Sequence, residues 1–337
     1  MTDALPATPS VADLDALVAE AVRAPSVLNT QPWRFVVDGA ALLLYADRSR
    51  QLTALDPDGR ELTISCGAAL TYLRIAARHA GWDATVFPFP VEGEADLVAG
   101  ITFEPTTRPR GDDRLFRALA LRRTNRQPFT GTPVPAAVTS EVVEAVSKEG
   151  ALLRVLTSPK KKDALASLVA AGIIEQGQDP EVVAEIGAWL RPSRDPRPDG
   201  VRDSAQGVWD RRASLRTPPS SVAAYKGRLI QEAPAVLVLS TAVDEPPEWL
   251  AAGQALARAL VVAADRGLAA SYANEPVEVD SLRGRVADLT GGGAPQVVFR
   301  LGYPEVEPAT PRRFARDVTE HRSSDAPRPL RGLRPTT

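Results

Sequence analysis

Residues 25 to 35 read Pro-Ser-Val-Leu-Asn-Thr-Gln-Pro-Trp-Arg-Phe, and this stretch decides how the rest of the chain is interpreted. Pro25 and Pro32 each bias the residue before them away from the helical region. The side chains between the prolines include a serine, an asparagine, a threonine and a glutamine, all of which form hydrogen bonds. An amphipathic helix is predicted at residues 11–23, and a strand begins at Trp33. The stretch is therefore a polar loop between a helix and a strand, a description that by itself also fits an ordinary connecting turn.

The composition is that of a soluble globular protein. The 337 residues are 44% hydrophobic and 24% charged, with a formal net charge of −2. This charge implies no general attraction to nucleic acid or to an anionic membrane, and no apolar run is long enough to span a bilayer. The N-terminus lacks the basic and apolar regions of a signal peptide. Cys66 is the single cysteine, which excludes an internal disulfide, so we expect a protein of the reducing cytoplasm.

Few side chains are suited to acid-base or metal chemistry. One cysteine and two histidines exclude a zinc site of the Cys/His type. His79 falls on a predicted helix and His321 in a polar C-terminal tail, so structural or solvated roles fit both better than general-base roles. No catalytic side chain is assigned. If the protein catalyses a reaction, we expect a cofactor to supply the chemistry.

Two long predicted helices, at residues 61–80 and 247–266, are similar at a constant offset of 186 residues. The shared positions are Gly67, Ala69, Leu70, Ala77, Gly81 and Ala84, which match Gly253, Ala255, Leu256, Ala263, Gly267 and Ala270. Alanine-rich helix composition explains some of these matches, but the shared glycines and the flanking strands favour an internal duplication. A break at residues 106–113 then divides the chain into halves at 1–110 and 111–337.

The two halves are not equivalent. Only the second half contains the run Arg122-Arg123-Thr124-Asn125-Arg126-Gln127-Pro128-Phe129. In an extended segment Arg122, Thr124 and Arg126 point the same way, and guanidinium groups bind phosphate in a bidentate manner. Charge alone does not distinguish a phosphate-binding segment from a solvated basic helix end.

These motifs resemble those of the nitroreductase family. Residues 25–33 match its FMN-binding loop, Pro-Ser-x-x-Asn-x-Gln-Pro-Trp, which in that family reaches across a homodimer interface to the flavin of the other subunit. Residues 122–129 are similar to the signature Arg-x-Ser-x-Arg/Lys-x-x-Phe, which holds the FMN phosphate. Residues 267–271 and Arg312-Arg313 resemble C-terminal features of the family, the latter a second phosphate contact.

The resemblance implies an α+β, nitroreductase-like fold in which two fused repeats form an intramolecular pseudo-dimer. One complete FMN site per chain follows, and a monomer is compatible with it because the dimer is internal. The loop would contact the isoalloxazine, and the second half would hold the phosphate. Ala273 and Asn274 would lie near the flavin N5 edge. The expected cofactor-binding residues are Pro25, Ser26, Val27, Asn29, Gln31, Arg122, Arg123, Thr124, Arg126, Gly267, Leu268, Ala273, Asn274, Arg312 and Arg313.

The expected function is that of an FMN-dependent oxidoreductase using NAD(P)H, with the acceptor and the choice between NADH and NADPH left open. Similarity to a fused subgroup of the family adds an alternative, an FMN-sequestering protein with little turnover. Residues 191–221, the lid segment, distinguish the oxidoreductase from the sequestering protein. A mobile surface loop would admit substrate, whereas an ordered cover over the flavin would block nicotinamide stacking. This segment is rich in proline and arginine, with Trp209 as its large apolar anchor. The phosphate motif disfavours a flavin-free scaffold.

Overall fold

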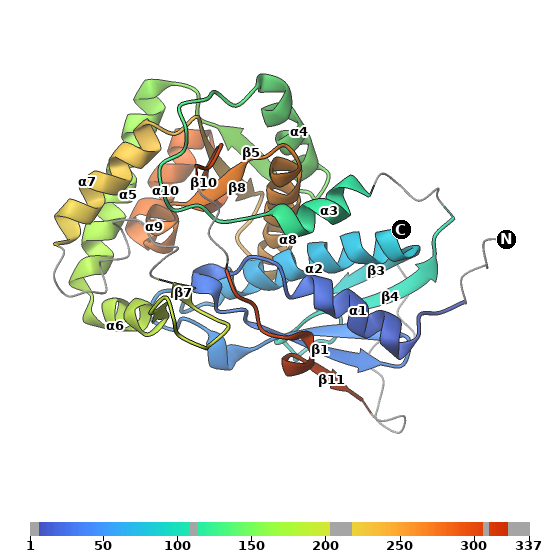
Figure 1. Ribbon diagram of the computed structural model, residues 1–337. Coiled ribbons are helices and arrows are strands. Elements are labelled where there is room, and N and C mark those ends of the chain that lie inside the picture. The colour runs from blue at the N-terminus through green and yellow to red at the C-terminus, as the bar shows by residue number, and fades with distance from the viewer. Residues whose placement is uncertain (1–6, 108–112, 203–217, 306–309, 323–337) are drawn as a thin grey trace.

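The computed structural model describes residues 7–107, 113–202, 218–305 and 310–322. Each half forms a layer of sheet and helices, and the two layers lie on either side of a pair of long central helices (Figure 1). None of the helices in the described ranges is long and apolar enough to cross a membrane.

The first half builds one layer around the predicted loop. Its elements are α1 (Val11–Ala21), β1 (Trp33–Asp38), β2 (Ala41–Ala46), α2 (Arg60–Ala80), β3 (Trp82–Pro88) and β4 (Leu97–Pro105). A capping box between Ser10 and Asp13 starts α1. Gly81 ends α2 with a φ of 96°, a left-handed conformation that glycine adopts at little cost. Short 3-10 turns at Val27–Asn29 and Arg48–Arg50 complete the connections.

The second half repeats this layer with insertions. Its elements are α3 (Arg114–Leu121), α4 (Ala136–Ser147), β5 (Leu152–Val155), α5 (Pro159–Gln178), α6 (Pro180–Ala188), β6 (Leu190–Arg191), β7 (Val201–Arg202), α7 (Pro219–Gln231), β8 (Ala235–Thr241), α8 (Pro246–Asp265), β9 (Ala269–Tyr272), α9 (Glu275–Glu278), α10 (Asp280–Thr290) and β10 (Ala294–Gly302). The strand orders are β1-β2-β4-β3 in one sheet and β5-β8-β10-β9 in the other, with antiparallel pairing throughout both series. Because α2 and α8 occupy the same place in the two series, the topology is that of a duplicated α+β unit.

The long helices α2 and α8 pack against each other through equivalent glycines. A Cβ atom on Gly67 would lie 2.1 Å from the carbonyl oxygen of Leu250, and one on Gly253 would lie 2.0 Å from that of Ile64. Ile64 and Leu250 are related by the same 186-residue offset as the two glycines. Gly67 therefore approaches Leu250, and their equivalents Gly253 and Ile64 approach each other. Such reciprocal contacts define a two-fold interface. The chain is thus a pseudo-dimer within one polypeptide.

The C-terminal region differs from the predicted polar tail. After a 3-10 turn at Ala315–Asp317, strand β11 (Thr319–His321) pairs in parallel with β1 at the edge of the first sheet. The end of the second half therefore crosses back to the first half (Figure 1). His321 lies on this strand with its Nε2 atom 3.1 Å from the Asp15 carboxylate, and His79 pairs with Asp113 at 2.7 Å. The tail prediction was wrong because three residues of strand carry too short a pattern to read from sequence.

Candidate functional site

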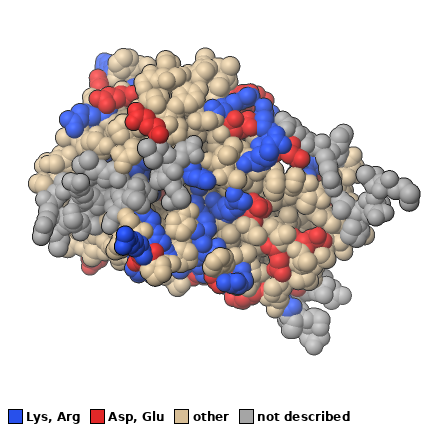
Figure 2. All heavy atoms as spheres, in the orientation of Figure 1, with Lys and Arg blue, Asp and Glu red and all other residues tan. Residues whose placement is uncertain are grey.

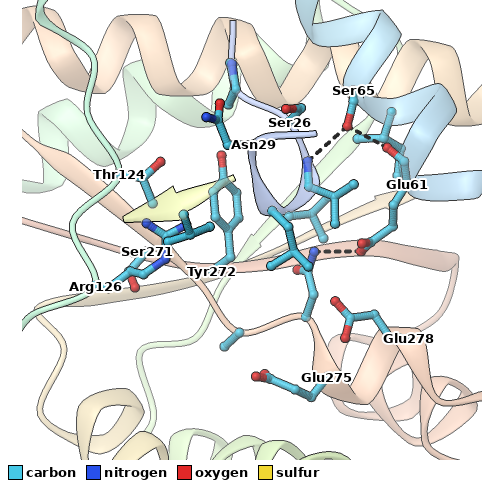
Figure 3. A pocket seen from close by; sticks show the side chains of 18 of the residues that line it. Ser26, Asn29, Glu61, Ser65, Thr124, Arg126, Ser271, Tyr272, Glu275 and Glu278 are labelled. Atoms are coloured by element: carbon cyan, nitrogen blue, oxygen red, sulfur yellow. Dashed lines mark hydrogen bonds between the residues drawn. The ribbon is translucent and has the colours of Figure 1, made fainter. Parts of the chain in front are cut away.

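A pocket lies where the two halves meet, and both halves supply its walls (Figure 3). The loop at residues 25–29 and one face of α2 come from the first half. Residues from β9, α9 and the segments around Thr124 and Arg312 come from the second half. The two halves therefore contribute complementary parts of one site, as the sequence predicts for a fused pair.

The loop holds an unusual backbone conformation. Leu28, Asn29 and Gln31 have φ values of 41°, 56° and 52°, in the left-handed region that residues other than glycine rarely adopt. Ser65 on α2 secures the loop, because its Oγ accepts from the Val27 amide at 3.2 Å and donates to the Glu61 carbonyl at 2.8 Å. Such strain persists where surrounding contacts hold it, and it is frequent at binding sites.

One end of the pocket is basic. Figure 2 shows Lys and Arg side chains gathered over the middle of the molecular face that it presents, where the halves meet. Arg126 and Arg312 line the pocket beside Thr124, and buried Arg122 supports them by donating to the Thr124 hydroxyl at 3.3 Å and the Tyr72 hydroxyl at 2.8 Å. No carboxylate of the described ranges forms an ion pair with these three arginines. Burial, and then repulsion from Arg122, lower the pKa of Arg312 to about 9, so it remains charged at neutral pH.

This basic end fits a phosphate monoester. Clustered guanidinium groups without acidic partners repel one another, and an anion bound between them removes that cost. Thr124 is held in an extended segment, because it bridges Ala270 of β9 and the next amide donates to the Ala270 carbonyl at 2.8 Å. The Tyr272 hydroxyl lies in the same pocket, buried and without a protein partner. The phosphate grip expected from the sequence stays a prediction, and this basic end is its candidate location.

The opposite end of the pocket is acidic. Glu61 of α2 and the pair Glu275 and Glu278 of α9 line it. Asn274 donates to Glu61 Oε1 at 2.8 Å and is itself oriented by the Val298 amide, which donates to its Oδ1 at 3.0 Å. Apolar side chains also line the pocket: Val27, Leu28, Leu55, Ile64, Ala68, Ile186, Leu229, Leu256 and Val297. An apolar slot with polar groups at its ends suits a flat, amphipathic ligand.

The described part of the lid segment is attached to the loop. The Asn29 side chain donates to the Gly200 carbonyl at 3.0 Å, and the Gln31 side chain donates to the Pro198 carbonyl at 2.9 Å. Asp199 forms ion pairs with both Arg50 and Arg191. Burial raises the pKa of the Asp199 carboxyl, but hydrogen bonds and charge attraction from the two arginines together outweigh it, so the pKa is lowered.

Nine of the predicted cofactor-binding residues line this one pocket: Pro25, Ser26, Val27, Asn29, Thr124, Arg126, Ala273, Asn274 and Arg312. The others do not line it: Gln31, Arg122, Arg123, Gly267, Leu268 and Arg313. Gln31 instead contacts the lid segment and the Arg313 amide, and Leu268 packs in the core of the second half. Their predicted contacts with FMN stay predictions. Trp209, the expected anchor of the lid segment, lies outside the described residues.

A model of the nitroreductase family matches residues 119–303, more than half of the chain. The chain belongs to the nitroreductase family. Two Mycobacterium tuberculosis H37Rv proteins extend the similarity across both halves. "Putative NAD(P)H nitroreductase Rv3131" is 32% identical over 321 residues, which cover 89% of each chain. "Putative NAD(P)H nitroreductase acg" is 31% identical over 327 residues, which cover 90% of this chain and 94% of the relative.

Solved structures of this family align with part of the chain. The FMN- and NADPH-dependent nitroreductase NfnB of a sphigopyxis strain is 20% identical, with 62% of this chain and 99% of that one covered and a TM-score of 0.42. The NADPH:FMN oxidoreductase of Vibrio harveyi is 14% identical, with 59% and 73% covered and a TM-score of 0.37.

Sequence reasoning missed the acidic end of the nitroreductase pocket. Glu61 reads as an ordinary acidic residue in the first turn of a helix, where carboxylates are common. Glu275 and Glu278 belong to a four-residue helix that carries no periodic pattern. The available signal was their spacing, since residues three apart share one face of a helix.

Proposed function

We propose that this chain binds FMN between its two halves and transfers hydride from NAD(P)H, through the flavin, to an acceptor. The observation that supports this most directly is the joining of loop 25–29 and the basic cluster at one pocket. FMN, when bound, supplies the hydride chemistry, and the protein binds and orients it. Arg126, Arg312 and Thr124 would hold the phosphate, while Val27 and Ile64 would lie along the ring and exclude water.

One FMN per chain is expected in the purified protein. The loop occurs only in the first half and the basic run only in the second, so the fused pair can complete one site and not two. Acid release of the flavin, followed by separation and quantification against protein concentration, measures the ratio. Two FMN per chain, or FAD in place of FMN, would contradict this asymmetric site.

A second candidate function is FMN sequestration with little turnover, and contacts of the lid segment favour it. Val201 and Arg202 line the pocket, and the Gly200 amide donates to the Asn29 carbonyl at 3.2 Å. A segment held in this way beside the flavin site limits the approach of nicotinamide. Rapid reduction of the intact protein by NADPH would favour the oxidoreductase over the sequestering function.

Asp199→Ala is expected to speed flavin reduction by NADPH about tenfold or more. The change removes hydrogen bonds to Arg50 and Arg191, and one charge-assisted hydrogen bond contributes about 1.5–3 kcal/mol. Since 1.4 kcal/mol is about a factor of ten, the segment should open more often by at least that factor. Stopped-flow bleaching of the flavin band reports the rate. Asp96→Ala, which removes an exposed ion pair with Arg48, is the control. An unchanged rate in an Asp199→Ala protein that retains FMN would exclude a covering role.

A further inference from the structure

The acidic end of the pocket holds a carboxylate with an unused oxygen. Glu61 is 4% exposed, and its Oε1 atom accepts the hydrogen bond from Asn274 at 2.8 Å and lies 3.5 Å from Arg60 Nη2. Its Oε2 atom is buried and has no partner in the structure. Figure 3 shows the Glu61 carboxylate turned toward the same space as Glu278. A buried polar atom without a partner is uncommon in native proteins and points to an absent ligand or to protonation.

The neighbours of Glu61 make this end richer in carboxyl groups than in cations. Glu278 accepts from the Gln176 amide at 2.6 Å, a neutral partner that removes no charge. Glu275 pairs with Lys226 at 2.7 Å and is the one acid of the three with an ammonium ion beside it. In the described ranges no group of three or more His, Cys, Asp or Glu side chains is arranged to hold a metal ion.

Burial and the surrounding charged groups act on both acids. Burial, and then Glu278, raise the pKa of Glu61 well above its ordinary value; Asp56 adds to the effect, whereas Arg60 and Asn274 oppose it. For the second acid, burial and then Glu275 raise the pKa of Glu278 to about 7, against the opposing effects of Gln176, Lys226 and Arg60. Glu278 is therefore close to half protonated at neutral pH, and the pKa of Glu61 is shifted in the same direction.

We propose that Glu61 and Glu278 share a proton and form the internal acid of this pocket, with Glu61 Oε2 as the atom that presents the proton to the bound flavin. The inference rests on the proposed function, because the flavin is the molecule served. Reduction of FMN by NAD(P)H adds one hydride, whose two electrons come from the nicotinamide. The neutral reduced flavin needs one further proton. An O–H bond of the pair breaks to supply it, the carboxylate that remains carries the negative charge, and solvent returns the proton later.

The shared proton can be tested by carboxyl titration of the whole protein. Glutamates labelled with 13C at the carboxyl carbon are followed by NMR from pH 4 to 9 in wild type, Glu61→Gln and Glu278→Gln. We expect the Glu278 carboxyl to titrate near pH 7 and the midpoint of Glu61 to move to lower pH in Glu278→Gln, because a like charge has been removed. Glu144→Gln, an exposed carboxyl outside the pocket, should change neither midpoint. If Glu61 and Glu278 titrate at the ordinary pKa of glutamate, or if Glu61 is unaffected by Glu278→Gln, the pair does not share a proton.

Coupling to the flavin has a separate readout, the midpoint potential of bound FMN between pH 6 and 8. For a two-electron couple, uptake of one extra proton steepens the pH dependence of the midpoint potential by about 30 mV per pH unit, since a tenfold change in the equilibrium constant corresponds to 29.6 mV. We expect the slopes of Glu61→Gln and Glu278→Gln to be shallower than that of wild type by up to this amount, with Glu144→Gln unchanged. Equal slopes in variants that bind FMN would overturn the proton-donor role. A protein that binds no FMN would instead contradict the proposed function, and the NMR titration would still decide whether the proton is shared.

Discussion

Arg126→Ala should weaken FMN binding about 10- to 150-fold, which corresponds to the roughly 1.5–3 kcal/mol of a lost hydrogen bond to a charged group. Arg126 lines the basic end of the pocket and forms no hydrogen bond or ion pair with another described residue. Its removal therefore leaves the internal contacts of the protein unchanged, and the loss should be confined to ligand binding. Flavin fluorescence titration of the flavin-free protein measures the dissociation constant.

Riboflavin provides the sharpest comparison for this variant. It has the same ring system without the phosphate, so Arg126→Ala should change riboflavin affinity little while FMN affinity falls. Arg122→Ala and Arg312→Ala should weaken FMN binding too, but both arginines also hydrogen-bond to protein groups, so their unfolding midpoints must be measured alongside. Arg316→Ala, at an exposed residue that does not line the pocket, is the matched control. Equal losses for riboflavin and FMN would show that Arg126 does not bind the phosphate.

The basic end and the loop could be predicted from sequence because their chemistry is local. Phosphate binding needs several donors on one short extended segment, and residues 122–126 supply them within five positions. The left-handed turn at Leu28 and Asn29 likewise lies between two prolines that mark it as a loop. In both cases the residues that act together are neighbours in the chain, so their pattern survives without knowledge of the fold.

The acidic end could not be predicted because its members meet only in three dimensions. Glu61 and Asn274 are 213 residues apart, yet the hydrogen bond between them determines where the carboxylate points. Strand β11 was missed for a similar reason, because it becomes a strand only by pairing with β1. The duplication was visible in the sequence as matched glycines. Their role at the crossing of α2 and α8 became clear only when the two helices were seen to pack against each other.

That crossing gives the largest expected effect on stability. Gly253→Ala should lower the free energy of unfolding by about 1–3 kcal/mol or more, the usual cost of overpacking a close-packed site. The added Cβ would lie 2.0 Å from the Ile64 carbonyl oxygen and 2.9 Å from the Gly67 Cα, and backbone atoms cannot turn aside as a side chain can. The midpoint of urea unfolding reports the change, provided that the slope of the transition is unchanged.

Gly284→Ala is the matched control, with the opposite sign. Gly284 lies within α10 with no atom within 4 Å of an added Cβ, so alanine should stabilise the protein by about 0.5–1 kcal/mol through helix propensity alone. Gly67→Ala should resemble Gly253→Ala, since the two glycines are equivalent in the pseudo-dimer. The double variant should cost less than the sum of the two single variants, because the helix separation forced by one methyl group makes room for the other. Additive costs, or a Gly253→Ala protein as stable as Gly284→Ala, would mean that α2 and α8 do not depend on this close approach. The two halves would then be held together by the edges of the pocket and by β11 rather than by the duplicated helices.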